Sequence, residues 1–328
     1  WLHCKKAILV GKNAAIKKKL KNNGVKMIDE INARKSFSTL IAKQLRLHQW
    51  VKNILVFVPA IAGHLLFEEG VFIETFSAFC SFCLIASGFY IINDIHDIDS
   101  DRRHPIKKDR PIASGQLPVN LALFISMIIF IMGTILALRL GFLFSIVILS
   151  YILLNIIYTR YIKQIIILDL ILLMMFYAIR LLAGYVPLEL PPSPWLLSFS
   201  IFLFFSLGLL KRYIETILLR ENNVVTISGR GYSINDSNIL MTMGVSSSLV
   251  AGLVLLLYTG SDNVTVLYNR PIILIALVPI YMYWVSWMWF MAGRGKIKSD
   301  PVIFAIKNKS TYIVLACLII VGILAGIK

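Results

Sequence analysis

Long apolar runs alternate with short polar segments along most of the chain. A run of about 20 predominantly apolar residues crosses the hydrocarbon core of a bilayer as a helix. Such runs are expected at about 50–67, 71–92, 118–138, 142–158, 165–186, 195–212, 238–258, 271–291 and 310–327. The pattern therefore predicts an all-α, polytopic membrane protein with about nine transmembrane helices.

The N-terminal segment differs from the rest because it is rich in lysine and contains no run long enough to cross a membrane. Its first half is typical of a short strand, a turn and a basic helix over about residues 7–20. We therefore divide the chain into a basic soluble segment, residues 1–45, and a transmembrane domain, residues 46–328. Because the chain begins at Trp1 and not at a methionine, we expect a fragment or a processed product.

The charge balance is strongly basic, with 33 Lys and Arg against 17 Asp and Glu and a net charge of +16. Nucleic-acid binding does not explain this excess, because the basic residues concentrate in the N-terminal segment and in alternate loops. The positive-inside rule does explain it, and predicts a cytoplasmic N-terminus and an external C-terminus in the inner membrane. A content of 58% hydrophobic residues also excludes burial in one soluble core.

The polar segment after the second run is unusually acidic. If the helix continues past residue 92, Asn93, Asp97 and Asp101 recur every fourth residue, and Asp94 lies on the same face. Proteins hold Mg²⁺ with carboxylates together with the phosphates of a substrate. We therefore expect Asn93, Asp94, Asp97 and Asp101 to bind Mg²⁺, with the three aspartates as catalytic residues.

A run of basic residues follows these acids directly. Arg102, Lys108 and Arg110 are candidates to bind the phosphate groups of a substrate beside the metal ion. The alternative is a polar loop whose cations only fix the membrane topology. That alternative explains the basic residues but not the acids, which repel one another at helical spacing unless a cation or protons intervene.

The whole stretch 93–115, NDxxDxxxDRxxPxKxxRPIASG, resembles the first aspartate-rich motif of the UbiA superfamily of intramembrane prenyltransferases. The resemblance implies helices around a central cavity that opens to the cytoplasm, and a Mg²⁺-dependent transfer that releases diphosphate. Some bacterial members carry a haloacid-dehalogenase-like domain ahead of the membrane domain, and residues 1–45 are similar to the tail of such a domain. Because that fold's catalytic aspartates are missing here, we expect no phosphatase activity. A basic tail lying on anionic lipid is the alternative.

A second resemblance concerns residues 46–53, RxHQWVKN, which lead into the first run. They are similar to the start of the superfamily branch that contains decaprenyl-phosphate phosphoribosyltransferase. The resemblance implies that Lys52 and Asn53 face the active site and bind substrate phosphate. Anchoring at the lipid boundary is the alternative for both residues.

The superfamily's second aspartate motif, usually of DxxxD type, keeps only one acid here. Asp169 opens the fifth run, but the residue four positions later is Leu173, which removes a ligand of the usual second metal ion. Lys163 and Asp169 instead resemble the YxxxxK plus Asp pattern of the phosphoribosyltransferase branch, which implies a catalytic Asp169 and a phosphate-binding Lys163. Arg180 lies eleven residues after Asp169, on nearly the same face of the expected helix and about 16 Å from it. It is expected to face the cavity and bind phosphate, or to pair with an acid on another helix.

Two adjacent cations, Lys211 and Arg212, end the sixth run in a KRxxE sequence similar to one that the superfamily carries. Cations at a helix end can hold a second phosphate group, and topology charges are the alternative.

A polytopic membrane protein with this pattern could be an enzyme, a transporter or a scaffold. A transporter would carry charges near the bilayer midplane, and a scaffold needs no metal-binding acids, so an enzyme is favoured. In most of the superfamily a polyprenyl diphosphate alkylates an aromatic acceptor such as 4-hydroxybenzoate. In the phosphoribosyltransferase branch, a polyprenyl phosphate attacks the ribose of phosphoribosyl pyrophosphate. The extra cations favour the second reaction, with a polyprenyl (decaprenyl) phosphate lipid and phosphoribosyl pyrophosphate as partners and Mg²⁺ as cofactor.

Overall fold

The computed structural model describes residues 6–10, 14–31, 36–103, 107–221, 231–298 and 300–327. The chain forms two compact units. Unit 1 comprises residues 1–48 and 86–131, and unit 2 comprises residues 49–85 and 132–328. Two long helices, α4 (Val71–His96) and α6 (Val119–Arg139), contribute residues to both units.

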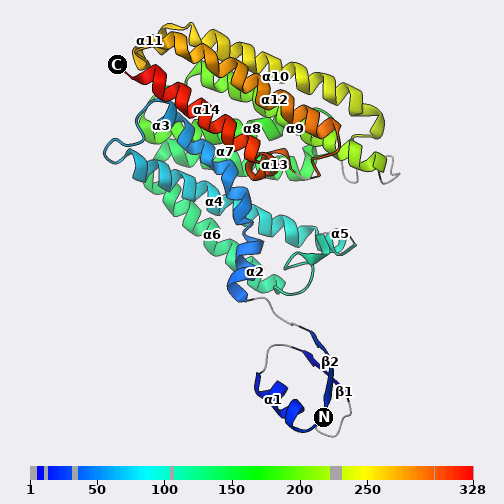
Figure 1. The fold of residues 1–328 in the computed structure, drawn as a ribbon. Coiled ribbons are helices and arrows are strands. Elements are labelled where there is room, and N and C mark those ends of the chain that lie inside the picture. The colour runs from blue at the N-terminus through cyan, green and yellow to red at the C-terminus, as the bar shows by residue number, and fades with distance from the viewer. Residues whose placement is uncertain are drawn as a thin grey trace. The chain divides into compact units, whose positions relative to one another are not determined.

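The N-terminal segment of unit 1 contains two parallel strands joined by a helix (Figure 1). β1 (Lys6–Val10) is followed by α1 (Ala14–Asn22), and β2 (Lys26–Ile31) then pairs with β1. The buried Leu20 and Val25 pack against Ala7 and Ile16. The expected strand and basic helix are therefore present, and β2 adds a strand that the hydrophobic pattern did not predict. The likeness to a haloacid-dehalogenase-like domain stays a prediction.

The first predicted span, residues 50–67, does not form one long α-helix. After α2 (Phe37–Gln44), Leu47–Phe57 form a 3-10 helix, η1, and Val58–Ala62 form the short helix α3. Pro59 has no N–H to donate within an α-helix, which favours a break here. Neither η1 nor α3 reaches the length of a membrane-spanning helix, and among the described residues this stretch is not one of the candidate spans.

Among the described residues, the other eight predicted spans correspond to eight helical segments that are long and apolar enough to cross a membrane. Besides α4 and α6 they are α7 (Phe142–Ile157) with η3 (Tyr158–Ile162), α8 (Leu168–Tyr185) with η4 (Val186–Leu188), α9 (Pro194–Glu221), η5 (Ile234–Asp236) with α10 (Ser237–Thr259), η6 (Pro271–Ala276) with α12 (Leu277–Gly293), and α14 (Lys309–Gly326). Large apolar side chains such as Phe124, Leu138 and Ile313 are exposed on them. The protein is therefore a polytopic helical membrane protein, as predicted.

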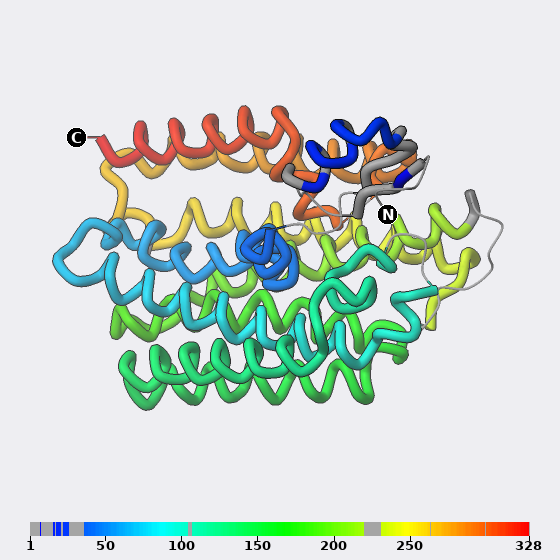
Figure 2. The backbone as a smooth tube through the Cα atoms, turned by 90° about the horizontal axis from the view of Figure 1, so that it is seen from below, coloured from blue at the N-terminus to red at the C-terminus, as the bar shows by residue number. Residues whose placement is uncertain are grey.

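The helices of unit 2 pack side by side in the order α7, α8, α9, α10, α12 and α14 (Figures 1 and 2). Small residues permit close approach between them. A Cβ at Gly244 of α10 would lie 2.2 Å from the Trp289 ring of α12. A Cβ at Gly184 of α8 would lie 2.1 Å from the Val56 carbonyl oxygen of η1. The irregular segment η1 is therefore fixed against α8, which determines where its polar residues lie.

Four further short elements lie among the described residues. In unit 1, α5 (Ile98–Arg103) and the 3-10 turn η2 (Lys107–Asp109) follow α4. In unit 2, α11 (Asp262–Leu267) follows α10, and α13 (Pro301–Lys307) precedes α14.

Candidate active site

The acidic residues of unit 1 follow the helical register that their spacing predicts. The Asp97 N–H donates to the Asn93 carbonyl at 2.9 Å, and the Asp101 N–H donates to the Asp97 carbonyl at 2.8 Å. The helical path thus continues from α4 into α5 through Asp97. Asp94 and Asp101 are buried, with 3% and 2% exposure, whereas the Asp97 side chain is 45% exposed.

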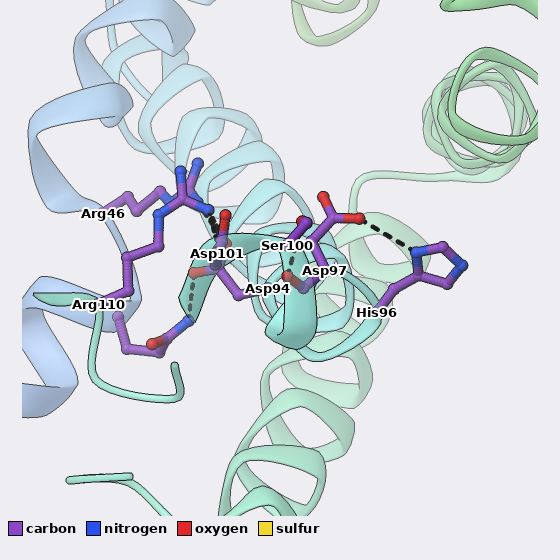
Figure 3. Close-up of polar contacts among 8 residues, drawn as sticks. Arg46, Asp94, His96, Asp97, Ser100, Asp101 and Arg110 are labelled. Carbon is purple, nitrogen blue, oxygen red and sulfur yellow. Dashed lines mark hydrogen bonds and ion pairs between the residues drawn. The ribbon is translucent and has the colours of Figure 1, made fainter. Parts of the chain in front are cut away.

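Two arginines form ion pairs with the buried carboxylates (Figure 3). Arg46 Nη2 lies 2.5 Å from Asp94 Oδ1. Arg110 Nη1 donates to Asp94 Oδ1 at 2.9 Å and to Asp101 Oδ2 at 2.5 Å. Two buried negative charges are therefore matched by two guanidinium groups, and one nitrogen of Arg110 joins both carboxylates.

The loop that carries Arg110 is anchored by its own residues. Ile112 and Leu117 are buried, and Arg102 Nε donates to the Ala113 carbonyl at 3.1 Å. Gly115 has φ +72°, a conformation that glycine adopts without strain. The RPIASG sequence therefore folds as a packed turn that presents Arg110 to the acids. Lys108 is exposed on this loop.

The aspartate Asp97 does not join the arginine cluster. Its Oδ1 lies 3.2 Å from His96 Nδ1, and its side chain points toward His96 and away from the arginines (Figure 3). Asn93 is half-buried. Among the residues that the structure describes, no three His, Cys, Asp or Glu side chains are grouped as metal ligands. Asp97 thus points away from the arginine cluster (Figure 3), and the Mg²⁺ site of Asn93, Asp94, Asp97 and Asp101 stays a prediction.

The amide of Gln44 offers a sign that a cation fits beside Asp94. Gln44 is 1% exposed, and its Nε2 donates to Asp94 Oδ2 at 2.9 Å. Its Oε1 is buried without a hydrogen-bond partner among the described residues. A buried acceptor without a donor is costly, and an ion that accepts oxygen ligands would satisfy it. Gln44, Asp94 and Asp101 therefore carry oxygen atoms of the kind that Mg²⁺ prefers.

A separate network, buried at Asp169 and Arg212, surrounds Asp169 in unit 2. Arg212 Nε donates to Asp169 Oδ2 at 2.9 Å, and Arg212 Nη1 donates to Glu215 Oε2 at 2.5 Å. The side chains of Asp169 and Arg212 are both 0% exposed. The Tyr232 hydroxyl donates to Asp169 Oδ1 at 2.7 Å. Asp169 and Arg212, expected to be catalytic and phosphate-binding, thus bind each other in the interior.

Tyr232 also holds the turn that precedes α8. Its hydroxyl accepts the Ile167 N–H at 2.8 Å. Ile167 has φ +67°, which is rare and strained for a β-branched residue. Burial, together with the hydrogen bond to Asp169, raises the pKa of Tyr232, so the phenol remains protonated and can donate. Lys163 lies half-buried just before this turn, at the end of η3.

Two of the predicted phosphate-binding lysines meet in unit 2 around Asp300. Lys52 Nζ of η1 lies 2.9 Å from Asp300 Oδ2, and Lys211 Nζ of α9 lies 3.8 Å from the same oxygen. Burial would raise the pKa of Asp300, but the two ammonium groups and the hydrogen bonds from Lys52 and the Val302 N–H outweigh it, so the pKa lies below its ordinary value. Asp300 is therefore a carboxylate that holds both lysines.

The cation Arg180 has only neutral partners among the described residues. Its Nε donates to Asn53 Oδ1 at 2.6 Å, its Nη2 donates to the Tyr151 hydroxyl at 3.0 Å, and its Nη1 donates to the Phe176 carbonyl. The guanidinium also lies 4.9 Å from the centre of the Tyr151 ring. Arg180 and Asn53, both predicted to bind phosphate, therefore contact each other and connect η1 to α7 and α8.

The sequence assigned no role to several partners of the site residues, including Gln44, Arg46, Tyr232 and Asp300. Arg46 begins the RxHQWVKN sequence and Asp300 lies in an Asp-Pro turn, so a signal existed for these two. Nothing in the sequence indicated that Gln44 or Tyr232 would bind the acids.

Residues 56–304 match the UbiA prenyltransferase family. The chain is 32% identical over 316 residues to the uncharacterized protein y4nM of Sinorhizobium fredii, covering 96% of this chain and 61% of that protein. It is 37% identical over 193 residues to decaprenyl-phosphate phosphoribosyltransferase of Corynebacterium glutamicum, covering 57% of each chain. The chain therefore spans less than two thirds of the length of either relative.

A similar fold occurs in a UbiA homolog from Archaeoglobus fulgidus whose structure was solved bound to GPP and Mg²⁺. The TM-score is 0.63 at 14% sequence identity, and the match covers 87% of this chain and 99% of the other. At this identity the likeness establishes a common fold.

Proposed function

The chain belongs to the UbiA prenyltransferase family, and from that premise we propose that it transfers 5-phosphoribose from phosphoribosyl pyrophosphate to a polyprenyl (decaprenyl) phosphate. As a family member it is a membrane-embedded transferase. The proposal concerns the substrates, the metal ion and the residues that bind them.

The observation that carries this choice is the surroundings of Leu173. The superfamily's second aspartate motif would place an acid at this position to bind a second metal ion. Here Leu173 lines a small cavity together with Lys52 and Lys211. Two ammonium groups and one carboxylate, that of Asp300, therefore share this cavity with Leu173. The additional cation suits a reaction whose two substrates both carry phosphate.

Resemblance to characterised enzymes supports the same choice. The Corynebacterium glutamicum relative is named decaprenyl-phosphate phosphoribosyltransferase and matches 57% of this chain at 37% identity. The matched part is large enough to include several transmembrane helices, so the likeness is not confined to one motif.

The proposed reaction is a substitution at the anomeric carbon of ribose. An oxygen of the polyprenyl phosphate forms the new bond to this carbon, and the bond to the diphosphate breaks. The diphosphate leaves with the bonding electron pair, and the lipid phosphate becomes a diester. When bound, Mg²⁺ neutralises charge on the departing diphosphate.

The chain's own residues have separate tasks in this reaction. Asp94, Asp101 and Gln44 would hold the metal ion through oxygen atoms. Arg46 and Arg110, released from the carboxylates, can bind the diphosphate, because a guanidinium recognises phosphate oxygens through two parallel hydrogen bonds. Asp97 is exposed and available to complete the metal site. Asp169 holds Arg212 and Tyr232 and so positions the start of α8.

Transfer of a polyprenyl group from its diphosphate to an aromatic acceptor such as 4-hydroxybenzoate is the second candidate. The observation that favours it is the common fold with a homolog solved with GPP and Mg²⁺. The aspartate and arginine residues of unit 1 suit either donor, because both reactions release diphosphate.

A product assay distinguishes the two reactions. Purified full chain in detergent with Mg²⁺ is supplied with phosphoribosyl pyrophosphate and polyprenyl phosphate in one tube, and with polyprenyl diphosphate and 4-hydroxybenzoate in another. The proposal expects a phosphoribosyl lipid in the first tube, identified by mass spectrometry. Product in the second tube alone would overturn it in favour of aromatic prenylation.

We also propose that the protein resides in the inner membrane with a cytoplasmic N-terminus and an external C-terminus. The distribution of Lys and Arg among the loops supports this orientation. It exposes the aspartate motif to the cytoplasm, where soluble phosphorylated substrates are available.

A further inference from the structure

A small cavity inside unit 2 brings together charged residues from three elements. Lys52 comes from η1, Lys211 from α9, and Asp300 directly precedes α13. The cavity has a volume of about 40 Å³, and its remaining walls are formed by Leu173, Tyr177, Leu207, Gly208, Pro301 and Val302. A cavity of this size holds about three water molecules, and the apolar walls limit how many can screen the charges.

The charges in this cavity are unequal. Asp300 Oδ1 accepts the Val302 N–H at 3.0 Å, so the lysines share its other oxygen, Oδ2. Lys52 forms a hydrogen bond to it at 2.9 Å, whereas Lys211 at 3.8 Å is beyond hydrogen-bond range. Among the residues that line the cavity, one carboxylate therefore accompanies two ammonium groups.

Neighbouring cations on α9 have opposite surroundings. Successive helical residues are rotated by about 100°. The Arg212 side chain is 0% exposed and bound to Asp169 and Glu215, whereas Lys211 is 34% exposed and lines the cavity. An anion in the cavity would therefore contact Lys211 together with Lys52, and not together with Arg212.

We propose that Lys52 and Lys211 form a binding site for one phosphate monoester group, with Asp300 as the positioning residue that holds both lysines. This inference rests on the proposed function and deepens it. That reaction has two phosphate monoesters besides the diphosphate: the 5-phosphate of the sugar donor and the phosphate of the lipid acceptor. The site takes one of them, and it is separate in composition from the aspartate and arginine residues that suit the diphosphate.

Binding measurements without turnover test this site. Isothermal titration calorimetry on the purified full chain in detergent uses three ligands: ribose 5-phosphate, polyprenyl phosphate, and inorganic diphosphate with Mg²⁺. Lys211→Met should weaken one of the two monoesters by about 10- to 100-fold, because a charge-assisted hydrogen bond is lost. The affinity for diphosphate should stay within about twofold. The monoester whose affinity falls is the one that binds between Lys52 and Lys211.

Two further variants keep the test decisive. Lys307→Met removes an exposed lysine from α13 and should change no affinity. If Lys52→Met alone does not fold, it is combined with Asp300→Asn. The double variant removes one charge of each sign and therefore leaves the charge balance of the cavity unchanged. This double variant should weaken the same monoester as Lys211→Met.

Unchanged affinity for both monoesters in Lys211→Met would overturn the proposal. Equal weakening of all three ligands, or equal weakening by Lys307→Met, would also overturn it. Because these measurements need no reaction, a monoester site found in a protein that carries out aromatic prenylation would leave the site standing while the proposed function fails.

Discussion

The arginine Arg110 is expected to compete with the metal ion for the aspartates. Its Nη1 donates to both Asp94 and Asp101, so a cation that uses these oxygens must first displace it. Each hydrogen bond to a charged group contributes about 1.5–3 kcal/mol. Arg110→Ala should therefore raise the affinity for Mg²⁺ without substrate by about 10- to 100-fold, the equivalent of losing one such bond.

The assay is a Mg²⁺ titration of the purified protein by calorimetry, first alone and then with inorganic diphosphate. In the native protein, diphosphate should increase the Mg²⁺ affinity, because it gives Arg46 and Arg110 a new acceptor. In Arg110→Ala this increase should be smaller, and turnover should fall. Thermal unfolding in the same detergent establishes that the variant is folded.

Arg103→Ala is the matched control. Arg103 is an exposed arginine of the same segment, and its Nε donates to the Asp99 carbonyl. Its removal changes the local charge equally without freeing a carboxylate. An Arg110→Ala protein that binds Mg²⁺ no more tightly than Arg103→Ala would refute the competition.

Three further predictions concern single acids. Asp97→Asn should leave the thermal unfolding temperature unchanged, since this side chain is exposed, but abolish turnover; an active variant at saturating Mg²⁺ would remove Asp97 from the metal site. Asp169→Asn leaves the buried Arg212 with less compensation and should lower the unfolding free energy by about 3–5 kcal/mol in denaturant titrations; a loss of activity alone would indicate a catalytic role instead. Because the pKa of Asp300 is lowered in the folded state, its stabilisation should be complete above about pH 4 and disappear as the pH falls below that value. Between pH 7 and pH 3, the unfolding temperature of Asp300→Asn should therefore fall less than that of the native protein. Equal falls in the two proteins would contradict this role of Asp300.

Periodicity predicted the features that depend on the chain's local geometry. The eight long helices of the described part of the chain follow from apolar runs of sufficient length. The register of Asn93, Asp97 and Asp101 follows from helical spacing. The first span was predicted as a helix because hydrophobicity does not distinguish an α-helix from η1 and α3. Only the backbone hydrogen bonds reveal the difference.

The partners of the charged residues depend on tertiary packing, which one sequence does not reveal. Lys211 and Arg212 are neighbours in the chain, yet they bind acids from different segments. Arg110 was expected to bind phosphate, but in this conformation it holds Asp94 and Asp101. The pattern identified residue types suited to phosphate and metal chemistry, whereas the structure reveals which of them neutralise each other.

The transfer itself is tested most directly by following two labelled phosphates of the sugar donor. Phosphoribosyl pyrophosphate labelled with ³²P at the 5-phosphate, and separately at the outer phosphate of the diphosphate, is incubated with the protein, polyprenyl phosphate and Mg²⁺. We expect the first label to enter the lipid fraction and the second to remain in water as diphosphate. Failure of the 5-phosphate label to enter the lipid would contradict phosphoribosyl transfer.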